Sequence, residues 1–274
     1  LNLKGKRVLI RVDFNVPLDE RGRITDDTRI RAALRTIRTV IVRGGRAILI
    51  SHLGRPGGQR DESLSLAPVA ERLSKLLDKK VAFISDCVGT EAEEAAAGMA
   101  DGDVILLENL RFHSGEKKGD PAFARDLSQL ADIYIDDAFG TAHRPHASMV
   151  AVPELIGTAA AGYLLKKEID YLGRAVENPK RPFIAILGGA KVSDKISVIT
   201  NLLDRVDSLL IGGAMAYTFL KGQGICVGAS KVEDEVEGKD GEKVNVSDLV
   251  NEIVEKAEKN GVEILLPLDH IEAD

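Results

Sequence analysis

Arginine and histidine side chains gather in a few short segments in the first half of the chain. Each of these segments follows an apolar run. The segments are RVDFN at 11–15, SHLGR at 51–55, NLRFH at 109–113 and DDAFGTAHRPH at 136–146. They hold every histidine of the chain except His270. Guanidinium groups bind phosphate and carboxylate groups through paired hydrogen bonds, so these residues suit a small ligand with several negative charges.

A charged residue in a loop is usually only solvated, and a single arginine here would carry no weight. The concentration of arginine and histidine in a chain of net charge −6 favours an anion site instead. Its charged candidates are Arg11, His52, Arg55, Arg111, His113, His143, Arg144 and His146. Asp13 and Asn15 could recognise a hydroxyl group on the same ligand, and glycine-rich turns would bring backbone N–H groups to it.

The second half of the chain has a different pattern, in which pairs of glycines follow apolar runs. Gly188-Gly189 precedes Lys191 and Lys195, and Gly212-Gly213 repeats the pair. A strand, a glycine pair and a helix start form an anion-binding arrangement, and the two lysines would share a face if both were helical. A tight turn with two solvated lysines is the simpler interpretation of one pair. Two such pairs favour a nucleotide site.

Other catalytic patterns are lacking. The sequence has no Walker A match, no GxGxxG, no GxSxG, no HExxH and no cysteine–histidine cluster, so no metal site is predicted. Asp136-Asp137 could bind a metal ion, but such a pair is more often a helix cap or an arginine partner. Cys87 and Cys226 are far apart, which argues against a secreted disulfide framework and for a reducing cytosol.

The chemistry-bearing segments must be positioned by the short apolar runs that precede them. Five such runs predict strands, at 8–10, 47–50, 81–84, 104–107 and 133–135. Amphipathic stretches between them predict helices, one opened by Asp26 and Asp27, one at 66–77 and one at 121–131. Continuous apolar strands alternating with helices indicate a parallel sheet covered on both faces, with ligands at the carboxyl ends of the strands.

A longer helix is predicted at 163–176, ending before Asn178-Pro179. Beyond it the alternation restarts, with strands at 183–187, 208–211 and 262–266 and helices at 193–203 and 246–259. The charged stretch 231–242 predicts a surface loop or hairpin. We therefore expect an α/β fold of two domains with parallel sheets, namely 1–162 and a shorter, incomplete domain at 178–274, joined by an interdomain helix at 163–177.

The composition of the chain limits the classes of molecule that it could bind. Hydrophobic residues make up 44% and charged residues 29% of the chain, as in an ordinary soluble globular protein. The acidic net charge argues against nucleic acid and anionic membranes as partners. No apolar run reaches the ~20 residues of a membrane span, and the charged N-terminus has no signal-peptide core, so a cytoplasmic protein is expected.

Seven ordered motifs add up to a known family. They are RVDFNVP at 11–17, DDTRI at 26–30, SHLGRP at 51–56, LLENLRFH at 106–113, DDAFGTAHR at 136–144, LGGAKVSDK at 187–195 and IGGAMAYTFL at 211–220. In all of them the chain resembles phosphoglycerate kinase. The resemblance implies reversible phosphoryl transfer between 1,3-bisphosphoglycerate and ADP in glycolysis, giving 3-phosphoglycerate and ATP. It also implies two Rossmann-like domains that close over a cleft, the first holding the phosphoglycerate and the second the nucleotide. We expect a monomer.

The same resemblance assigns roles to individual residues. The substrate-binding residues it implies are Asp13, Phe14, Asn15, Arg29, His52, Leu53, Gly54, Arg55, Arg111 and Arg144. The nucleotide-binding residues it implies are Gly189, Lys191, Lys195, Gly212 and Gly213. Arg29 and Lys191 would stabilise the transferring phosphoryl group. Arg29 depends on the resemblance alone, because the sequence pattern gives it no special role.

The family's later nucleotide motifs, NGPxGVFE and a GGGD stretch, would come after Asp274. We therefore expect this sequence to be a piece of a longer chain. The Mg²⁺ of the reaction would be carried by ATP or ADP, with its protein ligand in the later part. Two alternatives stay open. One is a non-catalytic phosphoglycerate- or nucleotide-binding module. The other is a dinucleotide oxidoreductase, which would require the GxGxxG that is lacking.

Overall fold

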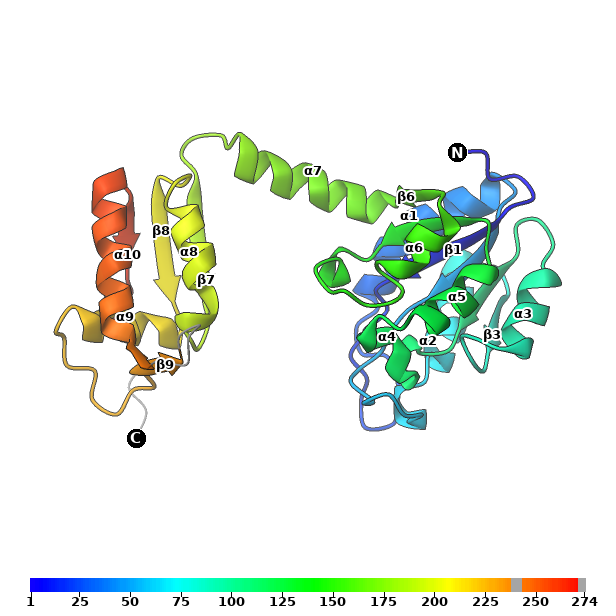
Figure 1. The fold of residues 1–274 in the computed structure, drawn as a ribbon, viewed down its shortest axis with the longest axis horizontal. Helices are drawn as coiled ribbons and strands as arrows, with labels where there is room; N and C mark the ends of the chain where they lie inside the picture. The colour runs from blue at the N-terminus through cyan, green and yellow to red at the C-terminus, as the bar shows by residue number, and fades with distance from the viewer. Residues whose placement is uncertain (238–242, 271–274) are drawn as a thin grey trace. The chain divides into compact units, whose positions relative to one another are not determined.

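The computed structural model describes residues 1–237 and 243–270, and the chain forms two compact units, Leu1–Asp170 and Tyr171–Asp274 (Figure 1). The division between them falls inside helix α7 (Tyr163–Glu177). Parallel strands alternate with helices in both units, which confirms the predicted α/β fold. The predicted boundaries at 162 and 177 stay an interpretation, because each unit includes a part of α7.

The first unit is built on one parallel sheet of six strands in the order β3-β4-β2-β1-β5-β6. The strands are β1 (Arg7–Val12), β2 (Arg46–Ile50), β3 (Val81–Ile84), β4 (Val104–Leu107), β5 (Ile133–Asp137) and β6 (Ala159–Ala161). Five of them match the predicted strands. The prediction missed β6, a three-residue edge strand of alanines, because alanine gives no β-branched or strongly apolar signal.

Helices cover both faces of this sheet, as the continuous apolar strands predicted. One hydrophobic core packs α1 (Thr28–Val42) and α2 (Ala67–Leu77) against side chains such as Val8 and Ile10. A second core packs α3 (Thr90–Ala97), α5 (Pro121–Gln129) and α6 (Ala151–Ile156) against Leu9 and Ile48. Short turns complete the unit: η1 (Glu62–Leu64), η2 (Leu110–Phe112), α4 (Ser114–Lys118) and η3 (Phe139–Thr141).

The second unit has a smaller parallel sheet of three strands in the order β11-β8-β7. Its strands are β7 (Ile184–Gly188), β8 (Ser208–Gly212) and β11 (Glu263–Leu265). Its helices are η4 (Ser193–Lys195), α8 (Ile196–Leu202), α9 (Ala214–Gly222) and α10 (Val246–Asn260). These helices and the sheet share one hydrophobic core, which includes Ile199, Leu209 and Val250.

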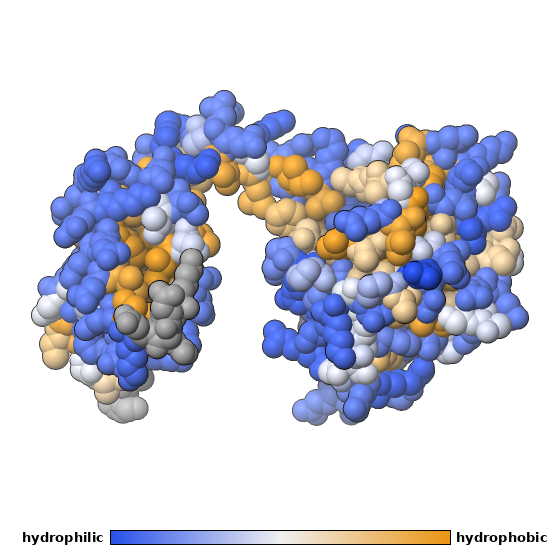
Figure 2. Space-filling model, viewed as in Figure 1, coloured by the Kyte–Doolittle hydropathy of each residue, from blue (hydrophilic) through white to orange (hydrophobic). Residues whose placement is uncertain are grey.

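In the described part of the chain, one face of the second sheet packs against the helices and the other face is more exposed. Ile186 of β7 is 75% exposed and Leu265 of β11 is 41% exposed, and Figure 2 shows hydrophobic surface on this unit. The expected hairpin is present as β9 (Glu235–Glu237) paired antiparallel with β10 (Lys243–Asn245). Residues 238–242 of that prediction lie outside the described residues.

Candidate functional site

The centre of the first unit's site is Arg11, a fully buried arginine. The sequence predicted it just after the first strand, but it is the fifth residue of β1, and its side chain is enclosed by neighbouring elements. Its Nη2 lies 3.1 Å from Nδ1 of His52, and its Nε donates to Oγ of Ser148 at 3.1 Å. The guanidinium also donates to the carbonyl of Val12. Arg11 therefore joins the ends of β1 and β2 to the segment after β5.

His52 is held as a neutral ring. Arg11 can only donate, so Nδ1 of His52 accepts and the ring proton is on Nε2. Burial, which is the largest cause, and the positive charges of Arg11, Arg111 and Arg144 together lower the pKa of His52 to about 2. The ring is thus an uncharged hydrogen-bond donor throughout the physiological pH range.

Two loops at this edge are tied together by Asn109. Its side-chain oxygen accepts from the backbone of Leu53 at 3.2 Å and of Arg111 at 3.0 Å, and its nitrogen donates to the carbonyl of Leu53 at 2.7 Å. Arg111 in turn donates through Nη1 to the carbonyl of Gly54 at 2.7 Å. The loops after β2 and β4 therefore form one rigid structure, which fixes Arg111.

Gly54 is needed where it is. Its backbone has φ of +62°, and a Cβ atom there would lie 2.6 Å from the side chain of Leu64. Its N–H donates to Oδ1 of Asn15 at 2.9 Å, which joins the loop after β1 to the loop after β2. Three of the substrate-binding residues that the family resemblance implies, Asn15, Leu53 and Gly54, are thus brought together.

Asp13 and Arg29 form an ion pair, with Arg29 in the first turn of α1. Oδ1 of Asp13 also accepts from the backbone of Asn15 at 3.2 Å. Phe14, between them, is buried, and its N–H donates to Oγ of Ser51 at 2.8 Å. The structure therefore brings Arg29 to the loop after β1, a position that no sequence pattern indicated.

We call Arg11, His52, Arg55, Arg111 and Arg144 the basic edge. Burial lowers the pKa of the Arg111 guanidinium, and the positive charges of Arg144, Arg11 and Arg55 act in the same direction. These charges therefore lie close enough to repel one another. Nε of Arg111 is buried without a hydrogen-bond partner among the described residues. A ligand with several negative charges would relieve the repulsion and satisfy this donor.

One buried acidic residue supports the basic edge, and the sequence analysis missed it. Glu116 is fully buried, and its carboxylate accepts from the backbone N–H of Ser148 at 3.0 Å and from its hydroxyl at 2.7 Å. The hydroxyl oxygen of Ser148 also accepts a hydrogen bond from Nε of Arg11, so Ser148 links Glu116 to Arg11. In the sequence Glu116 stands in a Glu-Lys-Lys run, which is typical of a solvated helix, so no local signal could have identified it.

The acidic pair at the end of β5, for which a helix cap or an arginine partner was predicted, accepts hydrogen bonds from the backbone. Oδ1 of Asp137 accepts from the N–H groups of Leu164 at 2.9 Å and Leu165 at 3.1 Å, at the start of α7. Oδ1 of Asp136 accepts from the N–H of Ala138 at 2.9 Å. Asp137 therefore caps α7, whereas Asp136 closes a turn within its own segment.

The predicted nucleotide residues come together at the ends of β7 and β8. A Cβ atom on Gly213, where φ is +67°, would lie 3.0 Å from the carbonyl oxygen of Gly189. A Cβ atom on Gly189 would lie 3.3 Å from Cε of Lys195. The side chain of Lys195 therefore lies over the glycine pairs, where backbone N–H groups and an ammonium group can receive phosphate oxygens.

Lys191 corrects one expectation about this loop. It precedes η4 and is not helical, so it does not share a helix face with Lys195. Lys191 lines a hollow of about 770 Å³ together with Ser193 and Asp194. It is exposed there, which leaves its ammonium group available to a ligand.

The sequence model of the family described as phosphoglycerate kinase matches residues 1–274. The chain belongs to the phosphoglycerate kinase family. It is 57% identical over 269 residues to phosphoglycerate kinase of Gloeobacter violaceus, covering 98% of this chain and 66% of that protein. It is 52% identical over 276 residues to the enzyme of Clostridium tetani, covering 100% of this chain and 66% of that protein.

A solved structure supports the same family. The phosphoglycerate kinase of Coxiella burnetii superimposes with a TM-score of 0.81 at 42% identity, covering 98% of this chain and 64% of that one. The resemblance inferred from the seven motifs is therefore confirmed. The present chain spans about two thirds of the length of the curated phosphoglycerate kinases that it matches. Among the described helices, none is both long and apolar enough to cross a membrane.

Proposed function

We propose that this protein transfers a phosphoryl group reversibly between 1,3-bisphosphoglycerate and ADP, giving 3-phosphoglycerate and ATP, as a phosphoglycerate kinase of glycolysis. The basic edge is the observation that carries the proposal. Four arginines and a neutral histidine lie close enough to act on one another's charge, and the buried Nε of Arg111 is left without a partner in the described chain. Phosphoglycerate has a phosphate and a carboxylate, which are the groups that such donors bind.

The roles within the first unit follow from the contacts. Arg111, fixed by Asn109 and Gly54, presents its Nε to the anion, and His52 presents its Nε2–H. Arg55 and Arg144 supply the surrounding positive charge. Asp13 and Asn15 remain at the loop after β1, where their oxygens can accept from the glycerate hydroxyl. We assign phosphoglycerate binding to this unit.

The chemistry needs positioning and charge stabilisation. The attacking group is already an oxyanion, either of ADP or of the phosphoglycerate carboxylate, so no general base is required. We assign stabilisation of the transferring phosphoryl group to Arg29 and Lys191. Lys195 and the N–H groups around Gly189, Gly212 and Gly213 hold the nucleotide phosphates in this proposal.

Magnesium would accompany the nucleotide and neutralise part of its phosphate charge. The loop that receives those phosphates offers Lys191 and Lys195, which cannot coordinate a metal ion, and the carboxylate of Asp194. Among the described residues, the only cluster of three potential ligands is Asp86, Cys87 and His113, in the first unit. The described residues of the second unit therefore do not form a magnesium site by themselves.

We also propose that the protein acts as a monomer in the cytoplasm. The two cysteines are free, and they are divided between the two units, which suits a reducing compartment. Only a measurement of activity distinguishes the enzyme from the alternative, a non-catalytic binding module. An assay that couples ATP consumption to 3-phosphoglycerate in the presence of Mg²⁺ makes that separation.

The assay is applied to the protein as it occurs in the cell and to two variants. We expect Lys191→Ala to lower kcat far more than it raises KM, since its contact strengthens in the transition state. We expect Arg144→Ala to weaken phosphoglycerate binding by about 1.5 to 3 kcal/mol. Arg125→Ala, on the exposed face of α5, is the control and should leave both constants unchanged. Phosphoglycerate binding without phosphoryl transfer would support the non-catalytic module instead.

A further inference from the structure

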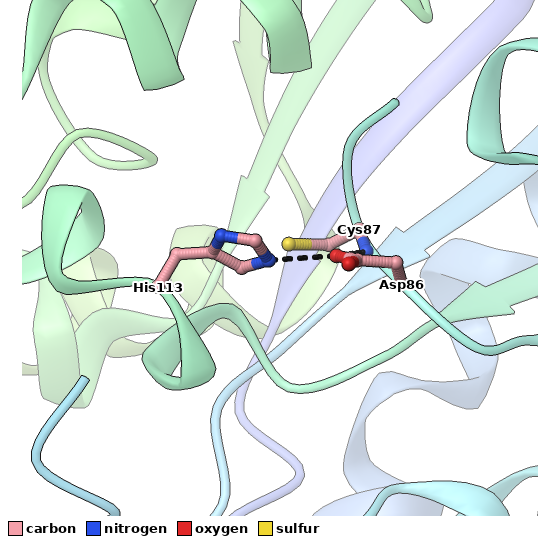
Figure 3. A group of neighbouring side chains, drawn as sticks. All are labelled: Asp86, Cys87 and His113. Atoms are coloured by element: carbon pink, nitrogen blue, oxygen red, sulfur yellow. Dashed lines mark hydrogen bonds and ion pairs between the residues drawn. The ribbon is translucent and has the colours of Figure 1, made fainter. Parts of the chain in front are cut away.

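A second group of chemistry-bearing side chains lies in the first unit, outside the basic edge. Asp86 and Cys87 follow β3, and His113 follows η2. Figure 3 shows the three side chains pointing toward one another, and one ligand atom from each lies within 4.8 Å of the others. The sequence analysis found no cysteine–histidine cluster, and the structure corrects this. Cys87 and His113 are far apart in sequence, and they meet because β3 and β4 are adjacent strands.

The group is held in place by contacts of its own. Nε2 of His113 lies 2.7 Å from Oδ1 of Asp86, and the imidazole is stacked on Phe123 with 5.2 Å between ring centroids. Oδ1 of Asp86 also accepts from the N–H of Cys87 at 2.6 Å. These contacts keep a nitrogen, an oxygen and a sulfur close together before any ligand arrives.

Nucleophilic catalysis by the thiol does not fit this arrangement. Cys87 is fully buried, so a substrate cannot reach its sulfur. Burial raises the pKa of the thiol, and the negative charges of Asp86 and Glu116 raise it further. His113 is engaged with Asp86 and makes no hydrogen bond to the sulfur within the described structure. A reactive cysteine needs the opposite surroundings, exposed and electropositive.

We propose that Asp86, Cys87 and His113 bind a zinc ion. Thiolate sulfur, imidazole nitrogen and carboxylate oxygen are the donors that Zn²⁺ takes in proteins, and a water molecule would complete the tetrahedron. In such a site the ligand atoms lie roughly 3.3 to 3.6 Å apart, as follows from Zn–S of about 2.3 Å and Zn–N of about 2.0 Å. Ligand atoms within 4.8 Å reach this spacing by small side-chain rotations.

Exposure and charge both suit a cation here. The side chains of His113 and Asp86 are 33% and 42% exposed, so two of the three ligands lie at the surface, where an ion can arrive. The carboxylates of Asp86, Glu116 and Glu108 contribute negative potential at Cys87. Arg60 is the opposing charge, and it is paired with Glu62 at 2.6 Å. The neighbouring basic edge binds anions, so the two sites take ligands of opposite sign.

A bound ion would connect the loop after β3 to the loop after β4. His113 ends the η2 turn that carries Arg111, so the ion would also brace one arginine of the basic edge. The proposal does not depend on the kinase reaction, because the ligand set and its test are independent of phosphoglycerate and nucleotide.

Two measurements test the site on the 274-residue chain without a polyhistidine tag. Equilibrium dialysis against Zn²⁺ should give one bound ion per chain. Titration with Co²⁺, which reports its ligands through its absorption spectrum, should give a tetrahedral spectrum with a thiolate-to-metal charge-transfer band. Cys87→Ala should abolish that band, and His113→Asn or Asp86→Asn should weaken Zn²⁺ binding roughly 100-fold.

Two variants serve as matched controls. Cys226→Ala removes the exposed cysteine, and His143→Asn removes an exposed histidine, and both should leave the stoichiometry and the band unchanged. Asp86→Asn and His113→Asn change half-exposed side chains, so they keep the test decisive if Cys87→Ala fails to fold. The proposal is wrong if the unaltered chain binds no stoichiometric Zn²⁺, or if the folded Asp86→Asn and His113→Asn variants bind it as tightly.

Discussion

The two units are made from the same alternation of strands and helices, yet they differ in how their sheets are covered. Helices pack against both faces of the six-stranded sheet, and side chains of β1 and β2 are almost entirely buried. In the described part of the second unit one core lies on one face, and Ile186 is 75% exposed. The same kind of apolar strand is therefore interior in one unit and partly surface in the other.

The sites differ in the same way. The first unit buries Arg11 and Glu116 completely and compensates them with hydrogen bonds, which requires surrounding structure on all sides. The second unit relies on backbone turns at Gly189 and Gly213 and on an exposed Lys191. The comparison teaches that a fully covered sheet can hold charged groups rigidly for an anion, while a half-covered one offers an exposed lysine and peptide N–H groups.

The largest effect is expected from removing the buried carboxylate of the first unit. Glu116→Ala leaves two donors of Ser148 buried without an acceptor and removes the buried carboxylate that is linked to Arg11 through Ser148. We expect the free energy of unfolding of this unit to fall by about 3 to 5 kcal/mol. Hydrogen exchange of β1 and β5 peptides measures it. Glu93→Ala, on the exposed side of α3, should change the exchange very little, and equal effects of the two variants would contradict the account.

Matched truncations of two isoleucines test the difference in sheet covering directly. Ile48→Ala empties a fully buried position in β2 and should cost about 3 kcal/mol. Ile186→Ala removes a side chain that is 75% exposed in β7 and should cost less than about 0.5 kcal/mol. Hydrogen exchange of each unit provides both values. A similar cost at the two positions would mean that the second sheet is covered as well as the first.

The pH dependence of stability gives a smaller and more specific effect. The folded chain keeps His52 neutral down to about pH 2, whereas the unfolded chain protonates it near pH 6.5. The unfolded state therefore binds more protons below pH 6.5, so this contribution to stability is full above that pH and is lost as the pH falls. Between pH 6.5 and 5 the loss should be roughly 1.5 kcal/mol.

His52→Asn keeps an acceptor for Arg11 and removes the titration. Between pH 6.5 and 5, the first unit of the His52→Asn variant should lose roughly 1.5 kcal/mol less stability than the first unit of the unaltered chain. His143→Asn, at an exposed position, is the control and should keep the original slope. An unchanged slope in His52→Asn would show that other groups cause the acid sensitivity. Urea unfolding followed by circular dichroism at several pH values distinguishes these results.

Most of the fold could be predicted because the strands carry uninterrupted apolar runs. Two of the missed elements, β6 and α3, have weak local signals. β6 is three alanines, and α3 is an alanine- and glutamate-rich helix with only two buried residues. Nothing in the neighbouring sequence distinguishes such segments from a loop or a solvated stretch, and tertiary packing decides them.

The site could be predicted in part for a related reason. Residues at strand ends, such as His52 and Arg111, followed from the sheet topology, and Arg29 followed from the family motif. Glu116 and Ser148 did not, because their roles depend on contacts between segments distant in sequence. The grouping of Cys87 with His113 was missed for the same reason, since no ligand spacing exists within a single segment.

The central claim is that the first unit alone contains a preformed site for phosphoglycerate. Isothermal titration of the 274-residue chain with 3-phosphoglycerate tests it most directly. The account predicts one binding site, weakened at least 10-fold in Arg144→Ala and Arg55→Ala and unchanged in Lys191→Ala. Absence of binding, or binding that Lys191→Ala abolishes while Arg144→Ala leaves it intact, would contradict it.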